Sequence, residues 1–202
     1  MIRPLETSRL LLRPLEVADA AQIQEIFPHW EIVRYLSPKV PWPYPEDGAL
    51  IYCRDIALPA SERGESWDWT LRLKADPSKL IGGISLFLQE NNQRGFWLAL
   101  SLHGQGLMTE AAIAVTDFWF EELNFPVLRV YKALENAASL RISEKCGMRV
   151  IATEERDYVS GRHLSQLCEI TAEEWRNRRR KPEVQARPMQ NRRKQPELKA
   201  DG

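Results

Sequence analysis

The clearest candidate for a functional site is a pair of glycines. They lie between a segment with the apolar pattern of a strand and a segment with the pattern of an amphipathic helix. Gly104 and Gly106 have no Cβ, so the backbone can turn tightly and a ligand can approach it closely. A helix predicted to begin at Leu107 leaves its first N–H groups unpaired and aims its positive dipole end at the same place. The order strand, Gly-x-Gly, helix therefore favours a phosphate-binding loop, although a plain turn without a ligand fits the same residues.

Two better-known phosphate loops do not fit this segment. A dinucleotide fingerprint requires a third glycine at the position that Thr109 occupies. A P-loop ends in Gly-Lys followed by Ser or Thr, and the chain has no such sequence here. The phosphate-bearing ligand is therefore not assigned from this loop alone.

A second segment narrows the interpretation. An apolar strand pattern over residues 128–133 leads into Asn136-Ala-Ala-Ser139 and a short helix that ends at Gly147. With the glycine loop, this segment resembles the GNAT family of acyl-coenzyme A-dependent N-acetyltransferases, and most closely the branch that includes ribosomal-protein-alanine N-acetyltransferases. The resemblance runs from Leu5 to about Trp175. It implies a mixed α/β fold with a central, mostly antiparallel sheet of six to seven strands, splayed at the cofactor site and flanked by four helices.

The resemblance also implies acetyl-CoA as co-substrate and a set of residues that hold it. Three residues at the end of a strand are expected to pair with the pantetheine amides, the glycine loop to bind the pyrophosphate, and Asn136 with Ser139 to orient the cofactor. Three positions depart from the family pattern: Ser101 replaces a Gln or Arg, Met148 replaces a Phe, and Ser143 stands where many members have a tyrosine acid. The implied cofactor-binding residues are Leu98, Ala99, Leu100, His103, Gly104, Gln105, Gly106, Leu107, Met108, Thr109, Asn136 and Ser139.

Amide formation from a thioester needs a base for the amine and a donor for the oxyanion, and the thiolate can need an acid. A backbone N–H of the strand before the loop is expected to serve the oxyanion. Ser139 is the candidate acid, although it also suits a helix cap. Glu110 and one of Glu154 and Glu155, with Glu155 preferred, are candidate bases, although Glu110 would also simply favour a helix N-terminus.

Acceptor contacts are expected from a proline-rich loop that carries Trp42 and Tyr44, although plain packing would explain both aromatic residues. No metal site is expected, because His29, His103 and His163 lack ligand spacing. Cys53, Cys146 and Cys168 form neither a disulfide framework nor a zinc pattern, and we interpret them as buried thiols.

Charge divides the chain into two parts. From Arg176 onward ten Lys and Arg face three Asp and Glu, a net charge of +7, so residues 1–175 carry −7 because the whole chain is neutral. Residues 1–176 are predicted to form one domain. The apolar-poor tail over residues 177–202 is expected to be disordered and able to contact a ribosome or another polyanion. No membrane span or signal peptide is expected, so the cytoplasm is the predicted location. The protein is expected to be a monomer or a dimer.

The apolar periodicity predicts the following elements. Strands are expected at 10–13, 67–73, 80–88, 96–100, 128–133, 149–156 and 163–170, with turns at 76–79 and 90–93, so that residues 67–100 form an antiparallel meander. Helices are expected at 19–26, with Asp19 as cap, and at 46–57, 107–123 and 138–145, with a short one from Ala172.

These observations predict an N-acetyltransferase that moves an acetyl group from acetyl-CoA to a primary amine by direct attack on the thioester. The branch resemblance implies a peptide N-terminus as acceptor. A small amine or antibiotic, and a protein that binds coenzyme A without catalysis, remain open alternatives.

Overall fold

A five-stranded antiparallel sheet forms one half of the protein. The computed structural model describes residues 2–180, and within them strands run in the spatial order β1-β2-β3-β4-β5. Each strand pairs only with its neighbours in sequence, which confirms the meander expected over residues 67–100. The strands are β1 Leu5–Glu6, β2 Leu10–Pro14, β3 Ser66–Leu73, β4 Asp76–Phe87 and β5 Arg94–Leu98.

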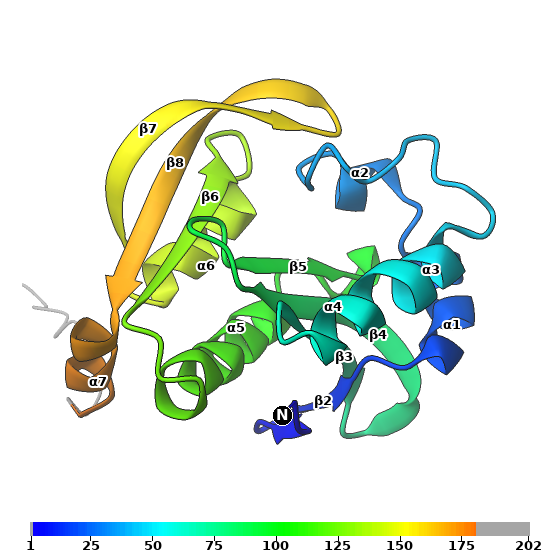
Figure 1. Cartoon of the computed structure of the whole chain (residues 1–202), viewed down its shortest axis with the longest axis horizontal. Coiled ribbons are helices and arrows are strands. Elements are labelled where there is room, and N and C mark those ends of the chain that lie inside the picture. The colour runs from blue at the N-terminus through cyan, green and yellow to red at the C-terminus, as the bar shows by residue number, and fades with distance from the viewer. Residues whose placement is uncertain (1, 181–202) are drawn as a thin grey trace, which may run out of the picture.

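A second sheet of three strands forms the other half. It has the order β6-β8-β7, with all pairs antiparallel, and comprises β6 Val127–Ala133, β7 Arg149–Tyr158 and β8 Gly161–Thr171. Strands β5 and β6 form no ladder and run in different directions, and the long β7–β8 hairpin arches over the top of the molecule (Figure 1). The single sheet expected from the sequence is therefore split between β5 and β6.

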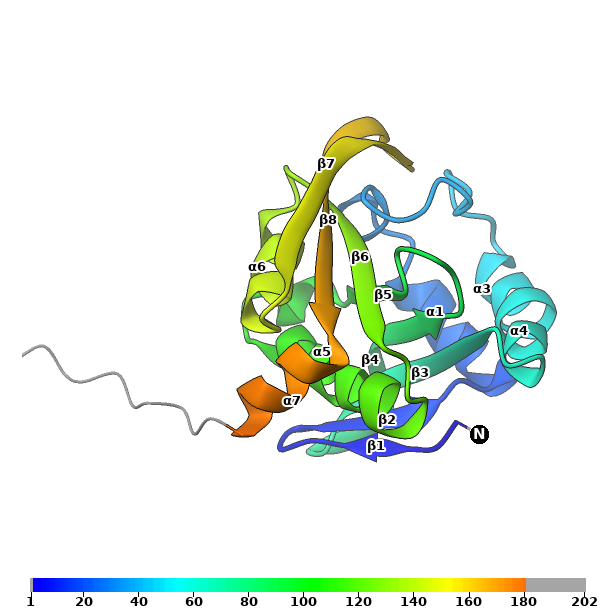
Figure 2. The same ribbon diagram turned by 60° about the vertical axis from the view of Figure 1, so that its left-hand side comes forward.

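Helices cover both faces of the five-stranded sheet. Helix α5 packs on one face, and α1, α3 and α4 lie on the other (Figure 2). Helices α1, α3 and α5 turn apolar side chains toward the sheet, so the sheet separates a large core that includes Trp69 and Val115 from a smaller one around Phe27 and Val33. The α-helices are α1 Ala20–Ile26, α2 Trp30–Val33, α3 Gly48–Ile51, α4 Leu58–Glu62, α5 Leu107–Asp117, α6 Ala137–Lys145 and α7 Ala172–Arg180.

Several predicted boundaries are wrong in detail. Residues 76–79, expected as a turn, begin β4, and the turn is the two-residue link of Lys74 and Ala75. A register shift near Arg72 absorbs the extra residues of β4. The expected helix over 46–57 begins later and continues through a π-helical stretch, Tyr52–Ala57, into α4. The expected helix over 107–123 is α5 followed by a π-helical stretch, Phe118–Glu122.

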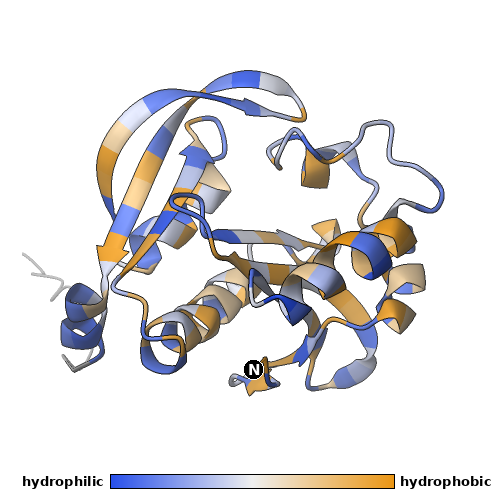
Figure 3. Ribbon diagram, viewed as in Figure 1, coloured by the Kyte–Doolittle hydropathy of each residue, from blue (hydrophilic) through white to orange (hydrophobic). Residues whose placement is uncertain are grey.

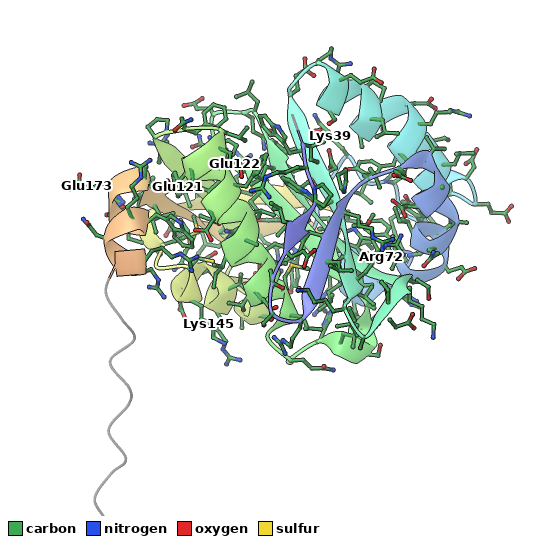
Figure 4. All side chains as sticks on the ribbon, turned by 90° about the horizontal axis from the view of Figure 1, so that it is seen from below. Lys39, Arg72, Glu121, Glu122, Lys145 and Glu173 are labelled. Carbon is green, nitrogen blue, oxygen red and sulfur yellow. The ribbon has the colours of Figure 1, made fainter. Side chains whose placement is uncertain are left out.

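Asp19 does not cap α1 with its side chain, contrary to the prediction. One carboxylate oxygen accepts from the backbone N–H of Glu16 at 3.0 Å, and the other accepts from an Nη of Arg72 at 2.6 Å. Both side chains are buried, and Arg72, labelled in Figure 4, comes from β3. A buried, hydrogen-bonded ion pair of this kind fixes where the first helix sits on the sheet.

The predicted end of the folded domain at residue 176 falls within α7, which continues to Arg180. Figure 3 shows α7 as hydrophilic over most of its length. It is held by Trp175, which is buried and donates to Asp117 Oδ1 at 2.9 Å, and by Arg178, which donates to the Lys145 carbonyl at 2.6 Å. The rest of the predicted basic tail, residues 181–202, lies outside the described residues.

None of the helices within residues 2–180 has the length and apolar composition that crossing a bilayer requires. The same residues contain no cluster of His, Cys, Asp and Glu side chains that could hold a metal ion.

Candidate active site

The site is built on the separation of β5 from β6. The two strands are joined at one end only: the Gln93 N–H donates to the Arg129 carbonyl at 2.7 Å, the Arg129 N–H donates to Gln93 Oε1 at 2.7 Å, and the Tyr131 N–H donates to Asn92 Oδ1 at 3.2 Å. Beyond these bonds the strands belong to different sheets. The edges that face each other there are consequently available to a ligand that extends between them.

Backbone groups of β5 point toward this opening. The Ala99 N–H donates to the Ile81 carbonyl at 2.8 Å, on the side of β4. Consecutive residues of a strand turn their backbone groups to opposite edges, so the N–H groups of Phe96 and Leu98 point away from β4 and toward β6. These two groups can donate to a thioester carbonyl or to pantetheine.

The expected pairing segment therefore shifts along the chain. Ala99 has both backbone groups engaged, because its carbonyl accepts from the Leu102 N–H at 3.0 Å. Leu100 begins a 3-10 turn, Leu100–Leu102, and so does not extend the strand. Of the three predicted residues only Leu98 belongs to β5, and Phe96 was missed because apolar alternation does not show which edge a backbone group faces.

The glycine loop lies at the mouth of the opening and has the predicted geometry. Gly106 is the N-cap of α5, and Gly104 and Gly106 have φ values of 76° and 78°, in the left-handed region that glycine tolerates best. Within residues 2–180, the backbone N–H groups of residues 104–109 have no acceptor. Such an array of exposed donors at a helix N-terminus is suited to phosphate.

Two side chains of the loop hydrogen-bond to the backbone of the preceding segment and leave the space in front of the loop N–H groups open. His103 Nε2 donates to the Leu98 carbonyl at 3.0 Å, which also assigns the proton to Nε2. Gln105 Nε2 donates to the Ser101 carbonyl at 3.3 Å. Leu107 and Met108 are buried in the large core. These four side chains are engaged or buried, so their residues offer a ligand mainly backbone groups. The side chain of Thr109 is only partly buried and can itself contact a ligand.

Glu110 does not face the opening, so the prediction that it is a base is wrong. Its carboxylate accepts from the Thr7 hydroxyl, the Ser8 hydroxyl, the Arg9 backbone N–H at 2.8 Å and Arg9 Nε at 2.7 Å. Burial works to raise the pKa of Glu110, but these hydrogen bonds outweigh it and lower the pKa to about 2. A carboxylate that is so weakly basic and fully engaged cannot take a proton from an amine.

Glu110 and Arg9 instead hold the loop in place. Arg9 Nη1 donates to the Gln105 carbonyl at 3.0 Å, so one guanidinium joins the β1–β2 turn, the loop and the first turn of α5. We call this set of contacts between Glu110 and residues 7–9 the Glu110 clamp. Its other donors are the hydroxyls of residues 7 and 8, so three consecutive residues of the β1–β2 turn hold the loop backbone in position.

Asn136 and Ser139 lie at the start of α6, as expected from the motif. Asn136 Oδ1 accepts from the Ser139 N–H at 3.1 Å, so Asn136 is the cap, and Ser139 is not. The Ser139 side chain is buried, and its hydroxyl has no hydrogen-bond partner within residues 2–180. That hydroxyl is available to a ligand.

Glu155, preferred as a base, and Glu154 lie on opposite faces of β7. Glu154 is paired with Ser165, which is paired in turn with Ala133, so these three side chains share the face of the sheet away from α6. Glu155 lies on the opposite face, 64% exposed, 3.7 Å from Arg162. The sequence predicted the alternation but could not show which of the two faces lay toward the acceptor.

The two aromatic residues of the proline-rich loop have different surroundings. Tyr44 packs edge-on against Phe27 with ring centroids 5.0 Å apart and belongs to the smaller core. Burial raises its pKa to about 12. Trp42 remains exposed and contacts Trp30, with centroids 5.5 Å apart. Only Trp42 is free to meet an acceptor.

A histidine that the sequence did not single out for catalysis lies on the same face of the second sheet as Glu154, away from α6. His163 Nε2 lies 2.8 Å from the Ser160 hydroxyl, and Nδ1 lies 3.4 Å from the Glu135 carboxylate. Its ring packs edge-on against Tyr35, with centroids 5.4 Å apart. The sequence offered no signal for this cluster, because residues 35, 135 and 163 meet only when the β7–β8 hairpin arches over β6.

The hairpin tip is bonded to the segment that follows α2. The Val159 N–H donates to the Leu36 carbonyl at 3.2 Å, and the Ser160 N–H donates to the Arg34 carbonyl at 3.0 Å. Figure 1 shows the hairpin reaching across the molecule toward α2. The face of the second sheet away from α6 is therefore bounded by a joined arch, the β7–β8 hairpin with its tip bonded to residues 34–36.

Exposed backbone donors at a helix N-terminus, at the mouth of an opening with free strand-edge donors, suit a ligand with phosphates and an extended amide chain, such as coenzyme A. The comparison with known families agrees: residues 9–149 match the acetyltransferase (GNAT) domain. The chain belongs to this family, is an acetyl-CoA-dependent N-acetyltransferase, and uses acetyl-CoA as its acetyl donor.

Known proteins of similar sequence and structure are also acetyltransferases. The uncharacterized N-acetyltransferase YnaD of Bacillus subtilis is 26% identical over 148 residues, 72% of this chain and 82% of that protein. The ribosomal-protein-alanine acetyltransferase of Vibrio fischeri superposes with a TM-score of 0.72 at 14% identity, covering 86% of this chain and 98% of the other. RimL, a ribosomal alpha-N-protein acetyltransferase solved with coenzyme A, gives 0.71 at 14% identity, over 85% and 99% of the two chains.

Replacing Gly106 with Val should weaken binding of coenzyme A at least tenfold, or about 1.4 kcal/mol, because the branched side chain strains a positive φ and keeps phosphates from the backbone. Titration calorimetry with coenzyme A measures the effect. Gly64→Val is the matched control: Gly64 also has a positive φ, of 73°, but lies in the turn after α4. Unchanged affinity in folded Gly106→Val would contradict the phosphate site.

The Glu110 clamp should make stability depend on pH in acid. Because folding lowers the pKa of Glu110 from 4.5 to about 2, its contribution is complete above pH 4.5 and is lost as the pH falls toward 2. Urea unfolding of the wild type and of Glu110→Gln should therefore differ most above pH 4.5, and the gap should narrow in acid. Glu65→Gln, which removes an exposed ion pair with Arg63, should show little gap at any pH. A gap of constant size would disprove the role of the charge.

Proposed function

We propose that the acceptor is the α-amino group of a protein or peptide N-terminus. The observation that carries this proposal is the joined arch of the β7–β8 hairpin over the acceptor side. A closed arch favours a slender group that enters end-on over an internal segment of chain. The ribosomal-protein acetyltransferases among the structural relatives support a chain terminus as that group.

For cofactor binding we propose three sets of groups. The loop N–H groups over residues 104–109 bind the pyrophosphate. The N–H groups of Phe96 and Leu98 face the pantetheine and the thioester carbonyl, where either can donate to the developing oxyanion. Asn136 orders the start of α6, and the unpaired Ser139 hydroxyl donates to the cofactor.

The amine must lose a proton before or during attack, and we propose that His163 receives it. Imidazole is the side chain that most often acts as a general base, and the Glu135 carboxylate, 3.4 Å from Nδ1, attracts the positive charge that proton transfer creates. The Ser160 hydroxyl donates to the Arg34 carbonyl at 2.6 Å, so the cluster is attached to the joined arch. Glu154, beside Tyr131 on the same face of the sheet, adds negative potential that attracts an ammonium group.

Acceptor choice can be decided by release of free thiol from acetyl-CoA. We expect peptides with a free N-terminus to be acetylated at least about tenfold more efficiently, in kcat/KM, than the same peptides with a blocked N-terminus and an internal lysine. Mass spectrometry of the products locates the acetyl group. A preference for polyamines or other small amines would replace the proposed acceptor, and binding of acetyl-CoA without turnover on any amine would indicate a non-catalytic binding protein.

His163→Gln should lower kcat by about a hundredfold, because a general base commonly contributes at least that factor. Affinity for coenzyme A should stay within about twofold, since His163 lies on the acceptor side. His29→Gln, an exposed histidine before α2, should leave both quantities unchanged. An unchanged kcat in folded His163→Gln would remove this residue from the mechanism.

A further inference from the structure

Two buried cations lie next to the opening between β5 and β6. Arg94, at the start of β5, has no exposed surface, and Lys132, near the end of β6, is 9% exposed. Within residues 2–180, neither side chain has a carboxylate within 4.0 Å. Arg94 Nη1 donates to Thr116 Oγ1 at 2.8 Å, and its Nε has no partner. Buried charges are ordinarily paired, so two neighbouring cations without an anion are unusual.

Lys132 extends to the side on which the cofactor is expected. Its Nζ lies 4.9 Å from the centre of the Phe96 ring, across the part of the opening where β5 and β6 do not pair. The Phe96 backbone is one of the two that face the opening. The side chain of Lys132 thus spans from one edge of the opening to the other.

The groups around Lys132 provide no negative charge. Arg94 faces it from β5, Cys168 from β8, and Cys146 from the residue that follows α6. Burial raises the pKa of Cys168, so this thiol is neutral. Burial, and then repulsion from Arg94, lower the pKa of Lys132 to about 7. An anion that entered the opening would therefore be strongly favoured by both cations.

The reaction of this family produces such an anion at the sulfur of coenzyme A. Ser143, where many family members have a tyrosine acid, is buried and too short to reach far from α6; its hydroxyl lies 3.5 Å from the Ser139 carbonyl. We propose that Lys132 is the catalytic acid of this enzyme, with Arg94 behind it as a positioning residue that keeps its proton mobile. The proposal rests on the sulfur of the cofactor lying in the opening between β5 and β6.

The proton balance closes without any further reactant. The amine nitrogen attacks the thioester carbon, the carbon–sulfur bond breaks, and its electron pair leaves with sulfur. The Lys132 ammonium transfers one proton to that sulfur, giving coenzyme A thiol and a neutral amine at Lys132. The proton that the new amide nitrogen loses returns through the base and solvent to Lys132, so the cycle ends with the enzyme unchanged.

This assignment differs from the expectation that Ser139 supplies the proton. A serine hydroxyl is a far weaker acid than an ammonium and would itself need a donor behind it. The Ser139 hydroxyl has no such donor within residues 2–180. Ser139 keeps its proposed contact with the cofactor, and Lys132 provides the proton and the positive charge.

Ionisation of bound coenzyme A tests the proposal without turnover. The ultraviolet absorbance of the thiolate, followed against pH with the free protein subtracted, reports the pKa of the bound thiol. If Lys132 acts on the sulfur, its positive charge should lower that pKa by at least about one unit in the wild type relative to Lys132→Met. Lys145→Met is the matched control, because Lys145 is an exposed lysine on the same helix as Ser143, and Figure 4 shows it extending outward. It should behave like the wild type.

Turnover and acetyl-CoA binding complete the test. Lys132→Met should lower kcat at least about a hundredfold, with a larger loss than Ser139→Ala, while affinity for acetyl-CoA, which has no ionisable thiol, changes less than about threefold. Equal thiol pKa values in the wild type and Lys132→Met would overturn the proposal. A chain that fails to bind coenzyme A at all would instead contradict the cofactor site itself.

The wild type alone provides a second measurement if Lys132→Met does not fold. The ultraviolet absorbance of the thiolate, followed against pH, compares coenzyme A bound to the wild type with free coenzyme A. The bound thiol should ionise at least about one pH unit below the free thiol, because only the ionised thiol is attracted by Arg94 and protonated Lys132. Equal ionisation of the bound and the free thiol would also overturn the proposal.

Discussion

The whole site depends on β5 and β6 ceasing to pair. Hydrogen bonds from Asn92 and Gln93 join the two strands at one end, and from there onward each sheet twists on its own course. Unpaired strand edges inside a protein leave polar backbone groups without partners, which is costly unless a ligand or water satisfies them. Under the proposed function acetyl-CoA supplies that pairing, so the gap in the sheet and the binding of the cofactor would be two aspects of one constraint.

The glycine loop depends on a second constraint, the attachment of its backbone. Exposed N–H groups bind phosphate well only if they are already held in position, because ordering them on binding would cost affinity. Arg9 and Glu110 provide that order from outside the site, by joining the β1–β2 turn to the loop and to α5. The turn between the first two strands, remote in sequence from the loop, thus fixes the position of the loop backbone.

Electrostatics divides the two sides of the opening. The α6 side holds the uncompensated cations Arg94 and Lys132, and the acceptor side holds Glu154, together with Glu135 beside His163. This distribution favours an anionic leaving group on one side and a cationic amine on the other.

The sequence by itself determined the parts of this protein that local rules govern. The glycine loop with its helix, the Asn136–Ser139 motif, the meander of β3, β4 and β5, and the family follow from short-range patterns, because turn geometry and helix starts depend on neighbouring residues. The tertiary structure alone decided which side chains face the substrates. The Glu110 carboxylate is hydrogen-bonded to the β1–β2 turn, and Glu155 lies on the face of β7 opposite to that of Glu154. His163 contacts Glu135 only because the β7–β8 hairpin arches over β6. The alternation of side chains along a strand shows that there are two faces, but it does not show what packs against each face. Contacts between residues about a hundred positions apart, such as Thr7 and Glu110, leave no periodic pattern in the sequence.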